Sequence, residues 1–293
     1  MRMSKTKPAN EPKTPLIEQV ADLAMRLSRP HLADYGATRS RHDFTQRQLM
    51  SCLILRAYLR TTYRGVLDVL AVSAALRQRL GLTDKLPHYT TLQKFSARSQ
   101  VLAIVQKLLA SIGRQAPVEK AAAMDATGLS RTTVSDYFCS RRGRQFRRWV
   151  KVSVVVLCGS LLPLALEVAL KPTHDCVQAR GLLAQAQAVA QPQRLYADAG
   201  YDAEWIHKQC REEWGVESVI QAVQRRADGQ RGGKWRAKMS ARYLKRADFG
   251  RRWAVESFFS ALKRTMGSAL SARRQEQMVA EAAIKVLAYA LRR

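Results

Sequence analysis

The chain has 293 residues and a formal charge of +27, because 50 lysine and arginine residues outnumber 23 aspartate and glutamate residues. Hydrophobic residues make up 47% of the sequence, which is ordinary for a chain that folds around a core. So large a positive excess favours a polyanionic partner, and nucleic acid is the simplest one. The longest uncharged stretch, residues 152–166, is shorter than the ~20 residues that span a bilayer, so we expect no membrane partner.

The five cysteines are scattered between residues 52 and 210 and include no C-x-x-C pair. This distribution argues against a disulfide framework and against a zinc site. The N-terminus is polar and lacks the apolar core of a signal peptide. The sequence therefore predicts a protein of a reducing cytoplasm.

Residues 1–14 contain lysine and proline and are expected to form a basic flexible arm. Over residues 15–115, apolar residues recur at three- and four-residue spacings, as in 49–55, 66–75 and 101–109, which predicts helices. Pro87 and the threonines after it predict a helix stop followed by a threonine N-cap. We interpret residues 15–115 as a helical DNA-binding domain, either helix-turn-helix-like or an ordinary small bundle.

After residue 115 the pattern changes to that of an α/β domain, expected to span residues 116–293. Helices are predicted at 175–190, capped by Thr173 or Asp175, at 203–214, around Glu256, and at 277–291. The order of elements predicts a mixed sheet flanked by helices on both faces. Strands are predicted at residues 121–125, 134–139, 149–157, 161–170, 195–197 and 219–223, with a hairpin turn at 158–160.

Three carboxylates stand in contexts that would aim them at one point. Asp125 ends the run AAAMD, and Asp198 ends the run RLYAD. If their strands are neighbours, both acids emerge at one edge of the sheet, where sites form in α/β proteins. Glu256 would approach from a packed helix. Carboxylate oxygens are the ligands that Mg²⁺ or Mn²⁺ prefers, so this trio in a cationic protein predicts metal-assisted phosphodiester chemistry on nucleic acid.

The neighbours of Glu256 add to this prediction. On a helix with 100° per residue, Arg252, Lys263 and Phe249 fall on the same face as Glu256. An ion-paired helix explains Arg252 and Glu256 taken alone. It does not explain Lys263 or the basic surroundings, which are typical of phosphate ligands beside a metal-binding acid.

Basic residues also cluster in two segments. Residues 131–151 contain seven basic residues and one acid, and residues 225–252 contain eleven basic residues and two acids. Trp235, Tyr243 and Phe249 are interleaved with the second cluster. Such mixtures suit contact with a phosphate backbone together with base stacking, although short charged loops are also common on protein surfaces.

With these residues in place, the chain resembles the DDE transposases of bacterial insertion sequences, in the broad group around families four and five. The resemblance rests on Asp125 in MDATG, on Asp198 in YADAGYD, and on the R-x3-E-x6-K arrangement of Arg252, Glu256 and Lys263. Family members often carry tyrosine where this chain has Phe249, so the hydroxyl is missing. Further matching elements are PTHD at residues 172–175 and PHYTTL at residues 87–92.

The resemblance implies a ribonuclease H-like catalytic domain and a DNA transposase that cuts at terminal inverted repeats and transfers strands into target DNA. It implies two Mg²⁺ ions per site, replaceable by Mn²⁺, held by Asp125, Asp198 and Glu256, with no small-molecule cofactor. The expected partners are double-stranded DNA and a second copy of the chain, in a bacterial cytoplasm at the nucleoid. A related nuclease, or a DNA-binding derivative without catalysis, is the alternative. The expected DNA contacts are Arg252, Lys263, Phe249, Arg251 and Arg264.

Overall fold

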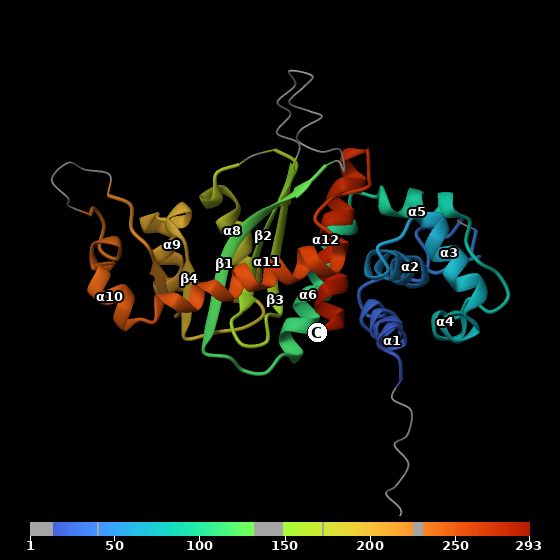
Figure 1. The fold of residues 1–293 in the computed structure, drawn as a ribbon, viewed down its shortest axis with the longest axis horizontal. Coiled ribbons are helices and arrows are strands. Elements are labelled where there is room, and N and C mark those ends of the chain that lie inside the picture. Colours follow the sequence, from blue (N-terminus) through green and yellow to red (C-terminus); the bar gives the residue numbers. More distant parts are fainter. Residues whose placement is uncertain (1–13, 40, 132–148, 172, 225–230) are drawn as a thin grey trace, which may run out of the picture.

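The computed structural model describes residues 14–39, 41–131, 149–171, 173–224 and 231–293. The strand predicted at residues 134–139 and nearly all of the predicted N-terminal arm lie outside these ranges. The described chain places a group of N-terminal helices beside a β-sheet that carries its own helices (Figure 1). None of the described helices is long and apolar enough to cross a bilayer.

The described residues between 16 and 115 form helices, as the apolar spacing predicts. They are α1 (Leu16–Ser28), α2 (Gln46–Tyr58), α3 (Tyr63–Val72), α4 (Ala74–Leu80), α5 (Tyr89–Ser96) and α6 (Val101–Gln115). The single helix predicted over residues 66–75 is two helices, because Ser73 is extended and its Oγ accepts a hydrogen bond from Leu76 N. The threonine N-cap predicted for α5 is wrong, since α5 begins after His88 and no side chain caps it.

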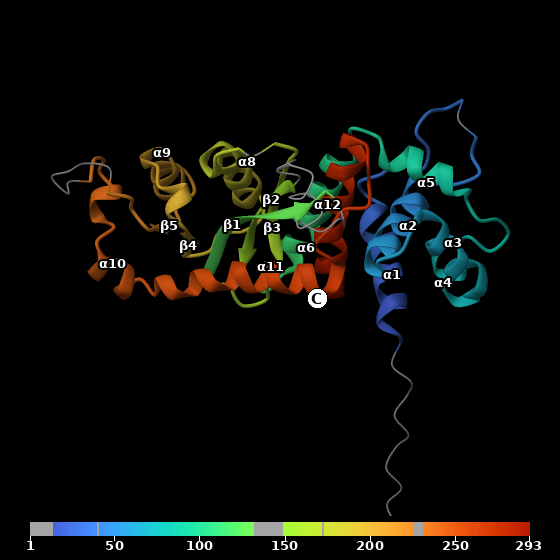
Figure 2. The same cartoon turned by 45° about the horizontal axis from the view of Figure 1, so that its top comes forward.

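The strands that the structure describes form one sheet in the order β3-β2-β1-β4-β5. They are β1 (Ala121–Ser130), β2 (Trp149–Leu157), β3 (Pro163–Ala169), β4 (Arg194–Ala197) and β5 (Glu217–Ile220). The first three strands pair antiparallel, which confirms the predicted hairpin, whereas β4 joins β1, and β5 joins β4, in parallel. The predicted mixed sheet flanked by helices is therefore confirmed (Figure 2).

The later helices alternate with β4 and β5 and then close the chain. They are α8 (Asp175–Gln187), η1 (Ala199–Tyr201), α9 (Glu204–Lys208) with a π-helical turn η2 (Gln209–Glu213), η3 (Arg236–Lys238), α10 (Ala241–Arg246), η4 (Phe249–Arg252), α11 (Trp253–Met266) and α12 (Gln275–Arg292). The side-chain cap predicted for α8 is wrong: His174 holds the N-cap position, and no side chain makes the capping bond.

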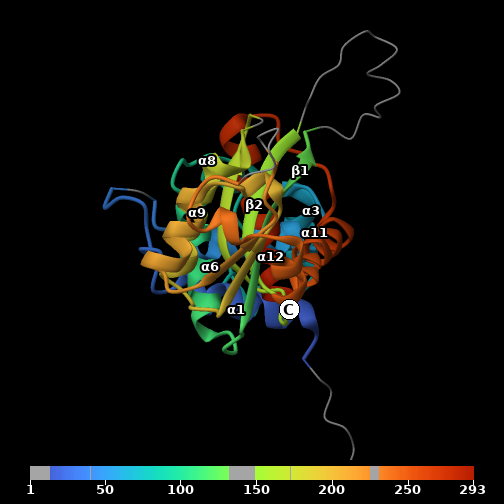
Figure 3. The same ribbon diagram turned by 90° about the vertical axis from the view of Figure 1, so that its left-hand side faces the viewer.

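Helices cover both faces of the sheet (Figures 2 and 3). Ala122 and Met124 of β1 pack with α8 and α9 on one face. Ala123 and Leu129 belong to the cluster with α6, α11 and α12 on the other face. Since successive residues of a strand point to opposite faces, the apolar run of β1 serves both layers.

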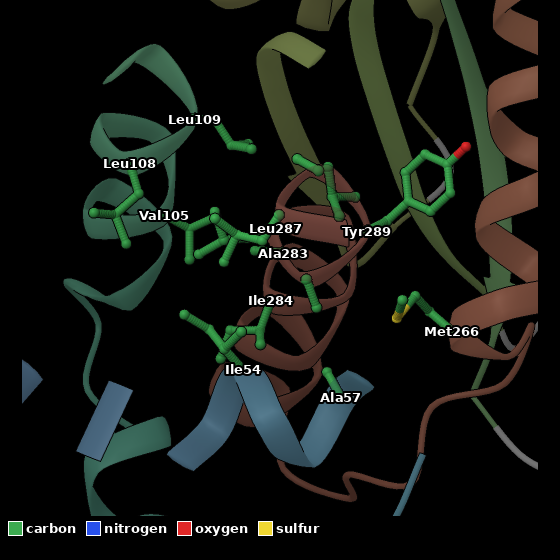
Figure 4. Packing of buried hydrophobic residues seen from close by; sticks show 14 of the residues in the cluster. Ile54, Ala57, Val105, Leu108, Leu109, Met266, Ala283, Ile284, Leu287 and Tyr289 are labelled. Carbon is green, nitrogen blue, oxygen red and sulfur yellow. The ribbon is translucent and has the colours of Figure 1, made fainter. Parts of the chain in front are cut away.

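The helix α12 lies between the sheet and the N-terminal helices (Figure 1). It is buried around its whole circumference from Met278 to Leu291 apart from Val279, and most of these residues are apolar, with Glu281 and Lys285 as the charged exceptions. Its Ile284 lies beside Ile54 of α2 (Figure 4), and its Tyr289 meets Phe258 of α11 edge-on, with ring centroids 5.2 Å apart. The N-terminal helices and the sheet therefore share one continuous core cluster.

One buried histidine makes the stability of this fold sensitive to acid. The Nδ1 of His207, on α9, lies 2.8 Å from Ser218 Oγ on β5, whereas its Nε2 is buried and has no hydrogen-bond partner among the described residues. Burial, followed by the charge of Arg211, lowers the pKa of His207 from 6.5 to about 4. Unfolding therefore takes up a proton as the pH falls through this interval, and folded-state stability is lost.

We expect this histidine to lower the free energy of unfolding by up to about 3 kcal/mol between pH 6.5 and pH 4. Denaturant unfolding across that range measures the effect. In a His207→Asn variant the amide can still reach Ser218 but does not titrate, so the pH dependence should flatten. An equally steep loss of stability in that variant would assign the effect to other groups.

Candidate active site

Asp125 and Asp198 emerge where two neighbouring parallel strands separate. The pairing of β1 with β4 ends at Met124 and Ala197, so each acid is the first residue beyond the shared ladder. The strands that precede the two acids are thus neighbours, which was the condition for both acids to emerge at one edge of the sheet. The prediction that Asp125 ends its strand is wrong, because β1 continues along β2 to Ser130.

The side chain of Asp198 begins a helical turn. Its Oδ1 accepts a hydrogen bond from Gly200 N at 2.9 Å and so caps η1. Gly200 is required here by close packing: a Cβ added to it would lie 2.6 Å from Asp175 Oδ2 and 3.0 Å from Asp198 Oδ1. The carboxylates of Asp175 and Asp198 therefore both lie close to this glycine.

The Asp125 carboxyl is largely buried, with 18% of its side chain exposed. Its Oδ1 accepts a hydrogen bond from Ala126 N at 2.7 Å. Burial raises the pKa of Asp125 to about 6; the charges of Asp198 and Asp175 add to the rise, and the Ala126 bond and Arg252 oppose it. The charged form of Asp125 is therefore disfavoured mainly because the carboxyl is removed from water, and to a lesser degree by the neighbouring acids.

Arg252 connects Asp125 to Glu256. Its Nη1 lies 3.5 Å from Asp125 Oδ2, and its Nη2 donates a hydrogen bond to Glu256 Oε1. The prediction that one helix carries Phe249, Arg252 and Glu256 is wrong, because α11 begins at Trp253 and the preceding residues form the tighter turn η4. The ion pair between Arg252 and Glu256 is present nonetheless, and the Glu256 side chain is 55% exposed.

Backbone geometry and one hydrogen bond place η4 beside β4. Asp248 adopts a left-handed conformation, with φ of 57°, that turns the chain into η4. The hydroxyl of Tyr196, two residues before Asp198, donates to Ala247 O at 2.9 Å. Phe249 is half-buried and packs against the main core cluster. The start of α11 is thereby fastened to the strand that ends at Asp198.

The other predicted DNA contacts lie along this segment. Arg251 Nε donates to Asp248 Oδ2 at 2.6 Å on the surface. Lys263 is half-buried, and burial lowers its pKa. Arg264 is exposed. Of the five residues predicted to touch DNA, Arg252 is thus bound to the acids, Phe249 is packed, and Arg264 is open to solvent.

Sequence reasoning missed a second cation and acid beside the site. The Lys151 amine, on β2, lies 2.6 Å from Asp175 Oδ1 and donates to Thr173 O at 2.6 Å, although only 5% of its side chain is exposed. The buried Tyr201 hydroxyl also faces this group, and the charges of Asp175, Asp125 and Asp198 help burial to raise its pKa. A lysine within the β-branched run of β2 was the signal available in the sequence.

The carboxylates suit a hard divalent cation. Oxygen donors are those that Mg²⁺ prefers, and the raised pKa of Asp125 marks a place where a cation would lower the electrostatic free energy. Within the described ranges, no group of three or more His, Cys, Asp or Glu side chains is assembled closely enough to hold a metal ion. Glu256 is instead paired with Arg252, and Asp175 with Lys151.

Comparison with known proteins identifies the class. The family model of the transposase DDE domain matches residues 116–291, more than half of the chain, and the chain belongs to that family. A solved structure that it resembles is a piggyBac transposase synaptic complex with hairpin DNA, at a TM-score of 0.47 and 9% identity, covering 95% of this chain and 72% of that one. No curated protein sequence matches the chain.

The contact of Arg252 with Asp125 leads to a titration test. Replacing Arg252 by glutamine removes a positive charge that lowers the pKa of Asp125, so we expect that pKa to rise above its value of about 6. Carbon-13 NMR titration of the aspartate carboxyls in metal-free protein measures it. The matched control is Arg251→Gln, which removes an exposed neighbour paired with Asp248. Equal pKa values in both variants would contradict the electrostatic link.

Proposed function

We propose that this protein is a DNA transposase that cuts DNA at the terminal inverted repeats of an insertion sequence and joins the freed ends to target DNA. The observation that supports this most directly is the meeting of Asp125 and Asp198 at the ends of a parallel ladder, with Glu256 linked to Asp125 through Arg252. Membership in the transposase DDE family supports phosphoryl transfer as the reaction of this group of acids.

In this proposal Asp125, Asp198 and Glu256 hold two Mg²⁺ ions, which Mn²⁺ can replace. Bound there, the ions supply Lewis-acid chemistry, namely activation of the attacking oxygen and stabilisation of the departing 3′ oxygen. Water attacks the phosphodiester at the element end, and the freed 3′ hydroxyl then attacks a target phosphodiester. The protein contributes fixed positions for the acids, since β1, β4 and the start of α11 are fastened together.

Arg252 has two roles in this scheme. In the absence of DNA and metal it forms ion pairs with both Asp125 and Glu256. When a cation takes over that role, the guanidinium is released to donate to a phosphate oxygen of the DNA. Lys263 lies seven residues after Glu256 on α11. It adds a second positive charge that can face the same DNA strand. The duplex partner and a homodimer that pairs two element ends belong to the same proposal.

The test is cleavage of labelled linear DNA that carries the ends of the element encoding this protein. We expect nicking at the ends with Mg²⁺ or Mn²⁺ and none with EDTA. Asp125→Asn, Asp198→Asn and Glu256→Gln should each lower the rate of cleavage by on the order of 10³-fold or more. When catalytic groups act as a unit, the loss of one costs nearly as much rate as the loss of all of them. Binding of the same DNA should persist in all three variants.

Asp68→Asn and Glu276→Gln are the matched controls, since both residues are exposed and lie on helices away from the acids. Cleavage that survives in Asp198→Asn would overturn the assignment of the site. Salt-sensitive binding without cleavage in any metal would identify a DNA-binding derivative instead. Cutting without joining would identify a ribonuclease H-like nuclease.

A further inference from the structure

A second basic site lies at the opposite end of α11, where the N-terminal helices meet the catalytic domain. A cavity of about 310 Å³ is bounded there by the end of α2, the residues that lead into α3, the segment after α11, and α12. Ala57 and Met266, both labelled in Figure 4, belong to its walls. The cavity therefore joins parts of the chain that are far apart in sequence.

Three cations and one acid line this cavity: Arg56, Arg60, Lys285 and Glu281. The acid is already occupied, because Glu281 accepts hydrogen bonds from Ser271 N at 3.0 Å and Ala272 N at 2.9 Å. It also lies 3.6 Å from Arg56 Nη2. The lining therefore carries two positive charges more than its one carboxylate balances.

Arg56 is held against the cavity with an unused donor. Its side chain is only 9% exposed, and its Nη2 donates to Ser271 Oγ at 2.6 Å. Its Nε is buried and has no hydrogen-bond partner in the part of the chain that the structure describes. An unpaired guanidinium donor in such a place is costly unless a ligand satisfies it.

Arg60 and Lys285 are brought together against the tendency of like charges to separate. A Cβ added to Gly267 would lie 3.5 Å from both Arg60 Nε and Lys285 Nζ. Burial lowers the pKa of Lys285; Glu281 opposes this, and the charges of Arg56 and Arg60 add to the lowering. Lys285 is held in place by Gly267 O at 3.1 Å and Ala269 O at 2.6 Å.

Arg60 differs from the other two cations because nothing in the described chain holds its guanidinium. It is exposed and makes no side-chain hydrogen bond or ion pair there. Its backbone nevertheless adopts the left-handed conformation, with φ of 53°, which is unfavourable for a residue with a side chain. That conformation turns the chain between α2 and α3 and keeps Arg60 at the mouth of the cavity.

We propose that this cavity binds a phosphate group of the DNA backbone, with Arg56, Arg60 and Lys285 supplying the positive charge. Arginine forks and a lysine amine are the ordinary ligands of phosphate oxygens. Thr61 and Thr62 also line the cavity, and Thr62 is the N-cap residue of α3, so the positive end of that helix begins beside it. This inference rests on the proposed function for the identity of the nucleic acid, although the cavity itself does not.

The distance between the two sites suits a single duplex. Glu256 and Met266 are ten positions apart on α11, which corresponds to about 15 Å along the helix axis. Successive phosphates of one strand are spaced by about 3.4 Å along the duplex axis, so this separation corresponds to about four base pairs. A duplex that lies along α11 with its reacting phosphate at the acids would bring a further phosphate of the same strand to the level of the cavity.

The test measures binding of the element-end duplex as a function of salt, by fluorescence anisotropy, in Asp125→Asn protein that cannot cleave. Adding Arg60→Gly should weaken binding and reduce the slope of log affinity against log salt by about 0.9, the value for one phosphate contact. The melting temperature should stay level or rise, since glycine suits the left-handed backbone. Arg60→Lys, which keeps the charge, should keep most of the slope.

Two further arms separate the alternatives. The control Arg29→Gln removes an exposed arginine on the surface. It should change the salt slope of the Asp125→Asn protein less than Arg60→Gly does. Inorganic phosphate alone, titrated by calorimetry, tests for a free anion: phosphate binding that depends on Arg60 with no change in the DNA slope would overturn the DNA assignment. An unchanged slope and no phosphate binding would overturn the site. A further outcome is that the wild-type protein never cleaves DNA while Arg60→Gly still reduces the salt slope of binding. That result would support phosphate binding in the cavity and reject the transposase proposal.

Discussion

The parallel ladder between β1 and β4 ends at Met124 and Ala197, whereas β1 continues beside β2 as far as Ser130. Because β4 stops first, the sheet opens on one side of β1, and the chain after β4 is free to turn. Asp125 and Asp198 are the residues that follow the last shared pair, so both leave the ladder at the same level. Strand pairing fixes the separation of their backbones before any side chain is placed.

The acids at this opening are each matched to a neighbour on a different element. Arg252 contacts Asp125 and Glu256, Lys151 contacts Asp175, and a backbone amide bonds to Asp198. Although the whole chain carries a charge of +27, these carboxylates are stabilised by the partners next to them and not by the overall positive charge. Burial, together with the nearby carboxylates, raises the pKa of Asp125. The proposed metal ions would bring more positive charge to the acids than Arg252 does, and would free its guanidinium.

The sequence was enough to predict the sheet, the helical N-terminal region and the position of Asp198, because a short apolar strand followed by Asp-Ala-Gly signals a strand and a turn. The end of the first strand was wrongly predicted at Asp125, because pairing with β2 carries that strand on to Ser130. Helical periodicity gave the wrong account of Arg252, since a left-handed Asp248 inserts a tighter turn. The Lys151–Asp175 contact joins residues from different elements, and no local pattern encodes it.

The helix α11 connects the acids to the cavity as a rigid spacer. Phe258, packed edge-on against Tyr289 of α12, holds one face of α11 in the core. Its ends carry the charges that its dipole favours, with Glu256 in the first turn and the Lys285 amine on the carbonyl of Gly267 after the last. A phosphate held beside Arg60 would consequently fix how far the duplex extends toward Glu256. Recognition at the cavity would then select which phosphodiester reaches the acids, without any contact to a base.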